Sequence, residues 1–263
     1  MRISRALGLS VAVALALVWL YAAWSGYDPV LDVHPELASL PPGPARWLGT
    51  DHLGRDVLRR LLLASHSFVG PGLAACAVAA TVALPLGALS GFVGGPTATL
   101  LRLPLSSVAS IPRFVWVLLA CTILTPSPAV LSIAAGLAYA PALSGALSAR
   151  VEALRRAEFV LASRAHGYAW WTILGHQILW VNCRRLVLRH LLHLFSFFLT
   201  LETSLSYIGN FGVAEPSPSW GNMLSFSFDR QDNPLAAAAP ALAIWITALG
   251  LSLLASDLER ADG

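Results

Sequence analysis

Long apolar stretches separated by short polar segments dominate the chain. A helix that crosses the hydrocarbon core of a membrane needs about 20 mostly apolar residues. Six stretches meet or approach this length, although Pro112 and Arg113 interrupt the start of the third. The pattern predicts an all-α integral membrane protein with about six transmembrane helices, and residues 1–263 form a single domain. The six stretches are residues 6–24, 68–92, 108–124, 128–147, 186–208 and 235–255.

The first stretch follows Arg2 and Arg5, an arrangement that also begins secretory signal sequences. Its apolar run is long for a signal, and Trp19 and Trp24 suit the membrane interface better than a cleavage site. We therefore expect the first stretch to be retained as a transmembrane helix.

The distribution of arginine predicts the orientation of the helices, because cytoplasmic loops of membrane proteins carry an excess of basic residues. With six spans and the N-terminus inside, eleven arginines lie on the cytoplasmic side and five on the outer side, while Arg113 lies at the edge of a span. The opposite orientation would reverse this bias. We therefore expect both the N- and C-termini to be cytoplasmic.

Two polar segments are expected on the outer side. Residues 209–233 precede the last span and contain several prolines. Residues 50–67 follow a proline-rich segment and predict an amphipathic helix that Thr50 or Asp51 caps. One face of this helix is apolar and the other is charged, with Leu53, Val57, Leu58, Leu61 and Leu62 opposite Arg55, Asp56, Arg59 and Arg60.

A polar loop on the cytoplasmic side, residues 150–182, separates the fourth span from the fifth. It predicts two short helices, residues 151–165 and 170–180. Gly167 lies between them, and glycine permits the left-handed conformation that ends a helix. A helix-turn-helix with mixed apolar and arginine faces suits contact with a partner protein. The alternative is a surface helix that rests on lipid headgroups.

Glycines recur at intervals of four residues where the second span ends, at Gly87, Gly91 and Gly95. Inside a membrane, small residues at this spacing let two helix backbones approach closely. The spacing therefore predicts a helix–helix contact rather than a ligand site.

Composition supports the membrane assignment and narrows the chemistry. Hydrophobic residues make up 56% of the chain and charged residues 12%, with a mean hydropathy of +0.67, whereas soluble domains carry about 25% charged residues. All 17 basic residues are arginine, which excludes a phosphate-binding loop with its lysine and Schiff-base catalysis. The three cysteines have no metal-ligand spacing. We expect no catalytic residue, metal, cofactor or nucleic acid on this chain.

Three runs of residues resemble motifs of one family. Residues 47–56, W-L-G-T-D-H-L-G-R-D, resemble the outer signature of permeases in the peptide and nickel branch of ATP-binding-cassette (ABC) importers. Residues 158–167, E-F-V-L-A-S-R-A-H-G, resemble the coupling motif of that superfamily, which reads E-A-A, then G, then I-x-L-P. Residues 205–209 and 216–224 resemble the outer loop before the last span. The three runs occur in the family's order.

The resemblance implies a channel-forming permease subunit of a bacterial inner-membrane importer, a multi-pass protein that is not itself an enzyme. The implied partners are a second homologous permease subunit, two ABC subunits that bind ATP and Mg, an extracytoplasmic solute-binding protein and membrane lipid. The implied mechanism is alternating access driven by ATP. The implied cargo is nickel, a metal–chelator complex or a short peptide.

The resemblance also implies roles for individual residues. Leu161 replaces the usual glutamate of the coupling motif and Trp180 replaces its proline. The residues that match the coupling motif are Glu158, Ala162, Ser163, Arg164, Gly167, Ile178 and Leu179. The residues that match the outer signatures are Gly49, Asp51, Gly54, Arg55, Asp56, Trp220 and Gly221.

Glu202 is the one ionisable residue well inside a predicted span, where exposure to lipid is costly. It either lines the translocation pathway or makes a structural hydrogen bond between helices. Arg189 and His193 lie on the same span nearer the cytoplasm and are further candidates for the pathway. A membrane-embedded enzyme and a passive channel are the alternative functions, although the chain has no H-E-x-x-H motif and no pair of aspartates within a span.

Overall fold

Helices form the regular structure of this protein in a computed structural model, which describes residues 2–26, 28, 31–209, 211–228 and 233–260. No β-strand occurs in these ranges, so the all-α prediction is confirmed. The helices are α1 (Arg2–Trp24), α2 (Val57–Leu63), α3 (Val69–Val93), α4 (Gly95–Ala109), α5 (Arg113–Ile123), α6 (Pro128–Leu154), α7 (Glu158–Ala165), α8 (Trp170–Thr172), a π-helical segment (Ile173–Cys183), α9 (Arg184–Ile208), α10 (Trp220–Phe228) and α11 (Leu235–Arg260).

The number of membrane crossings agrees with the sequence. Five continuous helical segments are long and apolar enough to span a membrane, and the bent pair α4 and α5 makes a sixth crossing when counted as one. Five of the six predicted spans are therefore confirmed. The five segments are Ser4–Trp24, Val57–Val93, Pro128–Leu154, Trp170–Ile208 and Leu235–Arg260.

The third predicted span, residues 108–124, is wrong as a single helix. The chain instead forms α4 and α5, whose axes differ by 77°. Pro112 lies at the break, and a proline disfavours the helical conformation of the residue before it, here Ile111. Arg113 is consequently the first residue of α5 rather than a residue at the edge of a span.

The glycines of the second span pack against α6, as predicted. A Cβ atom on Gly91 would lie 2.5 Å from the carbonyl oxygen of Ser148, so only glycine permits this approach. Ser90 donates a hydrogen bond of 2.9 Å to the Ser148 hydroxyl at the same contact. Gly95 differs from Gly91, because it has a positive φ of 65° and open space around it at the first residue of α4.

The helical parts of loop 150–182 have different bounds from those predicted. Helix α6 continues to Leu154, and the extended backbone of Ala157 then delays α7 until Glu158. The second helix begins at Trp170 as predicted, but it does not end near residue 180. It passes through the π-helical segment into α9, because no proline or glycine interrupts residues 176–208.

The outer helix also differs from its prediction. Helix α2 begins at Val57 and is capped by Asp56, whose side chain accepts a hydrogen bond of 2.9 Å from the Arg59 amide. Thr50 and Asp51 are therefore not its caps. On the predicted charged face, the side chains of Arg55 and Arg60 are buried.

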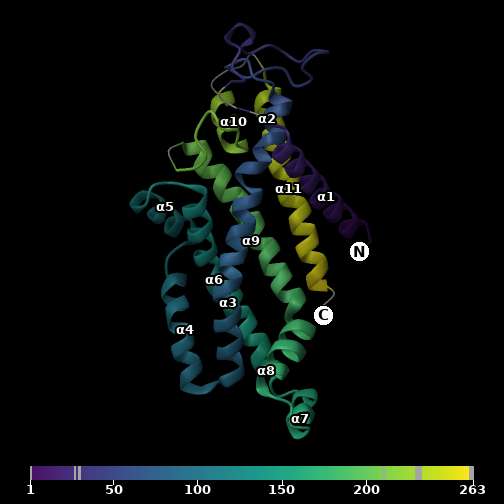
Figure 1. The fold of residues 1–263 in the computed structure, drawn as a ribbon, viewed down its shortest axis with the longest axis vertical. Helices are drawn as coiled ribbons and strands as arrows, with labels where there is room; N and C mark the ends of the chain where they lie inside the picture. Colours follow the sequence, from purple (N-terminus) through teal and green to yellow (C-terminus); the bar gives the residue numbers. More distant parts are fainter. Residues whose placement is uncertain (1, 27, 29–30, 210, 229–232, 261–263) are drawn as a thin grey trace.

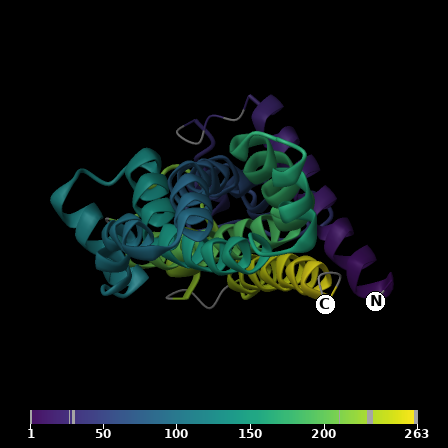
Figure 2. The same cartoon turned by 90° about the horizontal axis from the view of Figure 1, so that it is seen from below.

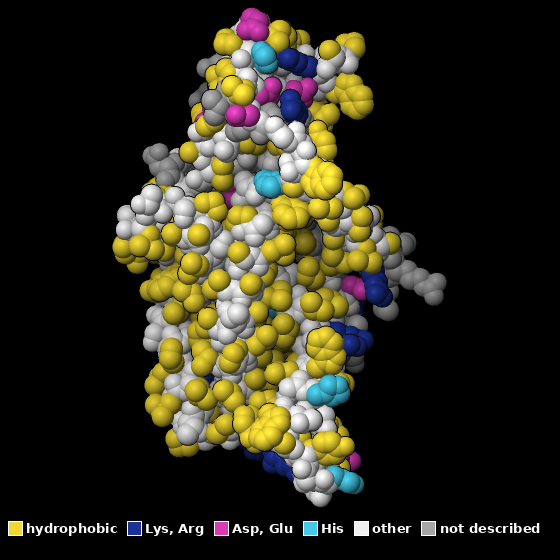
Figure 3. Space-filling model, viewed as in Figure 1, with side chains coloured by type: hydrophobic (Ala, Val, Ile, Leu, Met, Phe, Trp, Pro, Cys, Tyr) yellow, Lys and Arg dark blue, Asp and Glu magenta, His cyan; other side chains and the backbone are white. Residues whose placement is uncertain are grey.

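The two ends of the molecule carry its polar segments (Figure 1). Residues 31–56 and α10 lie at one end, and α7 lies at the other. Helices α4 and α5 flank one side of the bundle and α1 flanks the opposite side, as the second view also shows (Figure 2). On the face shown in Figure 3, the middle of the molecule is largely hydrophobic, and charged side chains gather at the two ends and along one edge.

Candidate functional site

The predicted coupling loop exposes one set of its residues and buries another. Glu158, Ala162 and Arg164 on α7 are exposed, as is Gly167 in the turn after it. Gly167 has a φ of 79° and open space around its Cα, so its backbone conformation rather than lack of room requires glycine.

The buried residues of the loop anchor it to the bundle. Ile178 is fully buried and Leu179 packs beside it, in a cluster that also contains Leu147 of α6 and Val160 of α7. Ser163 donates a hydrogen bond of 2.9 Å to the Gln177 side chain and so joins the two arms of the loop. Of the predicted coupling residues, Ile178 therefore positions the loop, and the exposed set is available to a partner.

An open groove of about 600 Å³ adjoins the loop between the end of α3 and α7. Its lining is basic, because Arg155, Arg156 and Arg164 all contribute to it together with Leu161. The guanidinium of Arg164 lies 5.3 Å from the centre of the Phe92 ring. Leu161, which replaces the motif glutamate, is thus surrounded by positive charge.

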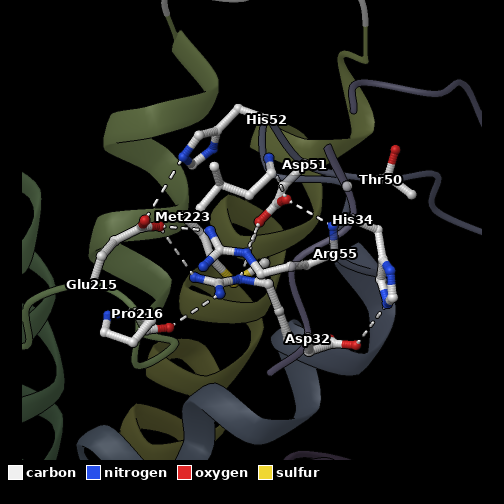
Figure 4. Close-up of polar contacts among 12 residues, drawn as sticks. Asp32, His34, Thr50, Asp51, His52, Arg55, Glu215, Pro216 and Met223 are labelled. Atoms are coloured by element: carbon white, nitrogen blue, oxygen red, sulfur yellow. Dashed lines mark hydrogen bonds and ion pairs between the residues drawn. The ribbon is translucent and has the colours of Figure 1, made fainter. Parts of the chain in front are cut away.

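The outer signatures form a buried ion-pair network (Figure 4). Arg55 donates one hydrogen bond of 2.7 Å to Asp51 and another of 2.7 Å to Glu215, which lies 160 residues further along the chain. Arg60 lies 3.6 Å from Glu215 and 3.4 Å from Asp51. His52 completes the network, with Nε2 3.7 Å from the second Glu215 oxygen.

The network sets the charge of its central carboxylate. Burial raises the pKa of Glu215, but hydrogen bonds from His52 and Arg55 and the charges of Arg55 and Arg60 outweigh burial and lower it to about 2. Burial lowers the pKa of Arg55, but the bonds and charges of Glu215 and Asp51 outweigh burial and raise it. Glu215 and Arg55 are therefore both ionised at neutral pH, and their pairing ties the outer segment to the loop before α10.

The remaining site candidates do not come together. Glu202 is fully buried and accepts a hydrogen bond of 2.8 Å from Ser206, with the hydroxyls of Ser67 and Ser219 also within reach. Arg189 pairs with Glu259 of α11 at 2.8 Å, and His193 is exposed. At about 1.5 Å of rise per residue, Glu202 lies about 20 Å along α9 from Arg189.

Comparison with known proteins places these features in a family, although no protein-family model matches the chain. The chain is 28% identical over 252 residues to the probable D,D-dipeptide transport system permease protein DdpC of Escherichia coli (strain K12), covering 95% of this chain and 83% of that protein. It is also 28% identical over 258 residues to the nickel transport system permease protein NikC of the same strain, covering 96% and 91%. This chain is a homologue of the permease subunits of ABC importers.

The fold of the permease agrees with this assignment. It resembles a chain of the MetNI methionine ABC transporter in an inward-facing conformation with a TM-score of 0.54 and 14% sequence identity, over 78% of this chain and 96% of that one. The permease therefore has the membrane fold of a type I importer. The two relatives are both named transport system permease proteins.

Two glycines of the outer signature shape the permease around the network. Gly54 has a φ of 76°, and a Cβ there would collide with the carbonyl of His34. Gly221 lies so close to α9 that a Cβ would collide with the carbonyl of Thr203. Beside it, the Trp220 indole donates a hydrogen bond of 2.9 Å to the Leu61 carbonyl. Gly49, the third glycine of the signature, also has a positive φ, of 73°.

Sequence reasoning missed part of this site in the permease. It assigned no role to Glu215 or His52, and it placed Arg60 on the charged face of the outer helix without a partner. Glu215 directly precedes the Pro216–Leu224 motif, and His52 lies inside the first signature. The presence of opposite charges in two motifs of one family was therefore the available signal for their pairing.

Proposed function

We propose that this chain is the channel-forming permease subunit of an ATP-driven importer that works by alternating access. Two ATP-hydrolysing subunits, a second homologous permease and an external solute-binding protein complete the assembly. The names of the relatives support a short peptide or nickel as the cargo, and the motif resemblance adds a metal–chelator complex. The arginine-rich end of the molecule, which includes α7, faces the cytoplasm, and so do both termini.

The observation that carries this proposal is the continuity of one helix from the loop to the outer end. Trp170–Ile208 is a single helical segment of 39 residues, and it begins three residues after the Gly167 turn. A push on α7 is transmitted through the buried contacts of Val160 and Ile178 to this segment. The far end of the same helix carries Glu202, next to the loop that contains Glu215. The segment therefore acts as a lever between the two ends.

A π-helical stretch supports the same interpretation. Residues 173–183 have π-helical geometry within the lever. Such stretches are uncommon and occur frequently at functional sites. A stretch of this kind permits a change of helical register between the coupling loop and α9, as a lever that bends during transport requires.

The positive charge of the basic groove suits the binding of a partner with acidic side chains. Its three arginines flank Leu161, the position at which the family motif has a glutamate. A partner segment that carries carboxylates into this groove would compensate for the missing glutamate. The free energy for a near-complete switch between two states, about 5.5 kcal/mol, comes from ATP binding to that partner.

The substitution Gly167→Val tests the proposal. At a φ of 79°, an L-residue costs about 1–2 kcal/mol, and the β-branched valine disfavours the turn further. No neighbour lies within 4 Å of the added Cβ, so membrane insertion and packing stay intact. In proteoliposomes with all subunits, we expect ATP hydrolysis to continue while solute uptake falls.

Gly175→Ala provides the matched control, because Gly175 also has open space around it but lies inside the helix. We expect this variant to retain uptake. Normal uptake by Gly167→Val would contradict the coupling role of the loop. Solute flux through the unmodified assembly without ATP would instead favour a passive channel.

A further inference from the structure

The break between α4 and α5 brings an arginine to the middle of the apolar layer. Arg113 begins α5, and its guanidinium carbon lies 4.6 Å from the centre of the Tyr139 ring. Tyr139 is the twelfth of the 27 residues of α6, so it lies near the middle of a membrane-spanning helix. The pair α4 and α5 has the length and composition of a crossing, and Arg113 is inside it.

Other basic side chains converge on the same place. His190 of α9 packs against Tyr139, with ring centres 6.2 Å apart. Arg189 precedes His190 on α9, and His193 lies one turn further along the same helix. We refer to Arg113, Tyr139, His190 and His193 as the midspan basic cluster.

The cluster has little opposing charge in this chain. Arg189, at its edge, pairs with Glu259 at 2.8 Å. No carboxylate in the described ranges forms an ion pair with Arg113, whose side chain is exposed on this subunit. The Nδ1 atom of His190 is buried without a hydrogen-bond partner among the described residues. The dipole of α5 adds further positive potential at its first residue, Arg113.

Electrostatics restricts what this cluster faces. A charged side chain at the centre of a bilayer is costly when exposed to lipid, so such residues face a water-filled cavity or an opposite charge. In transporters, broken helices place their positive ends at sites for anionic groups of the substrate. A permanent positive charge at a broken helix thus suits a site that an anionic solute occupies only during transport.

The geometry points to the midspan basic cluster as a binding step for a carboxylate on the transported solute. This inference rests on the proposed function, and it specifies a carboxylate as the group of the solute that the transporter recognises. The carboxylate is either the free C-terminus of a peptide or a carboxylate ligand of a metal chelate. The guanidinium of Arg113 provides the positive charge and the paired N–H donors that bind the carboxylate. The rings of Tyr139 and His190 position the Arg113 side chain.

Chemical modification of Arg113→Cys in the assembled transporter tests the site without knowledge of the solute. The probes are water-soluble methanethiosulfonates, one with a sulfonate group and one with a trimethylammonium group, each calibrated on a free thiol. We expect modification in at least one nucleotide state, with the sulfonate probe favoured about tenfold by the remaining positive potential. The unsubstituted permease is the control, because its three cysteines are buried.

Two results of this experiment would overturn the inference. Absence of modification in every nucleotide state would show that position 113 faces lipid or protein rather than water. Preference for the cationic probe would show that a carboxylate of another subunit pairs with Arg113. Either result leaves the coupling test at Gly167 unaffected.

Uptake measurements then separate the solutes. The probes are a dipeptide, the same dipeptide with its C-terminus amidated, and nickel citrate. We expect Arg113→Gln to reduce uptake of the transported carboxylate probe about tenfold, Arg113→Lys to retain part of it, and the amide to be insensitive. Arg102→Gln on α4 is the control, because Arg102 pairs with Glu152 on the surface.

The outcomes for the site and for the proposed function are distinct. Equal uptake of the carboxylate probe by the unsubstituted transporter and Arg113→Gln would contradict the site alone. Failure of the unsubstituted transporter to carry any of the probes would contradict the proposed cargo, while the modification experiment would still decide whether the site exists.

Discussion

The substitution Glu215→Gln probes the ion-pair network that joins the outer segment to the loop before α10. It preserves the size of the side chain but removes its charge. Arg55, which is fully buried, would keep Asp51 as its only carboxylate partner among the described residues, and Arg60 would lose a carboxylate 3.6 Å away. The perturbation is thus the loss of a buried charge pair with little change in shape.

The free-energy cost of the substitution can be derived in two ways. Glu215 has a pKa of about 2 in place of its ordinary 4.5, and this difference corresponds to about 3 kcal/mol at 1.36 kcal/mol per pKa unit. Removing one partner of a buried ion pair generally costs about 3–5 kcal/mol. We therefore expect the outer segment to lose about 3 kcal/mol of local stability.

The sign of the pH dependence follows from the lowered pKa. A carboxyl group whose pKa is lower in the folded state stabilises that state most above its unfolded pKa. The contribution of Glu215 is therefore complete above pH 4.5 and is lost as pH falls toward about 2. The Glu215→Gln variant should lack this acid-dependent loss.

Hydrogen exchange of the amides in residues 49–57 measures the effect, because these amides are protected by bonds inside the outer segment. A loss of about 3 kcal/mol corresponds to exchange roughly 100-fold faster. Arg59→Gln is the matched control, since Arg59 lies beside Arg60 on α2 but is partly exposed, 3.8 Å from Asp32. It should cost less than about 1 kcal/mol. Equal exchange in the two variants would refute the reasoning.

Two further predictions concern helix packing. Gly91→Val places a Cβ 2.5 Å from the Ser148 carbonyl oxygen, so we expect a loss of more than about 2 kcal/mol in thermal or denaturant unfolding; Gly145→Ala, with open space around it, should be neutral, and similar stability of the two variants would refute the α3–α6 contact. Trp220→Phe removes the donor to the Leu61 carbonyl and should cost about 1–3 kcal/mol, whereas unchanged unfolding would show that water replaces the indole.

Much of the fold could be predicted from local sequence. Five spans were correct because a stretch of about 20 apolar residues is sufficient to identify a membrane helix. The turn at Gly167 and the start of the second loop helix at Trp170 were also predicted, since a glycine with a left-handed conformation has a local signature. The family resemblance could also be recognised from local sequence, because its motifs are short runs of residues.

The helix ends and side-chain positions that were predicted wrongly depend on contacts between residues far apart in the sequence. Helix α6 extends to Leu154 because Val151 is buried against other helices, although the prediction ended the span at residue 147 and began a separate helix at residue 151. The periodicity of residues 53–62 predicted a charged face that includes Arg55 and Arg60, but it did not indicate that both side chains are buried. Periodicity identifies a polar face but not the carboxylates that allow the face to be buried.

The sequence by itself determined that this protein lies in a membrane and where five of its apolar spans lie, because hydropathy acts on neighbouring residues. Only the tertiary structure decided what the break at Pro112 achieves, namely the placement of Arg113 over Tyr139. It also decided that Glu215 pairs with Arg55 across 160 residues. Such pairings depend on how distant helices pack, and no local pattern in the chain specifies that packing.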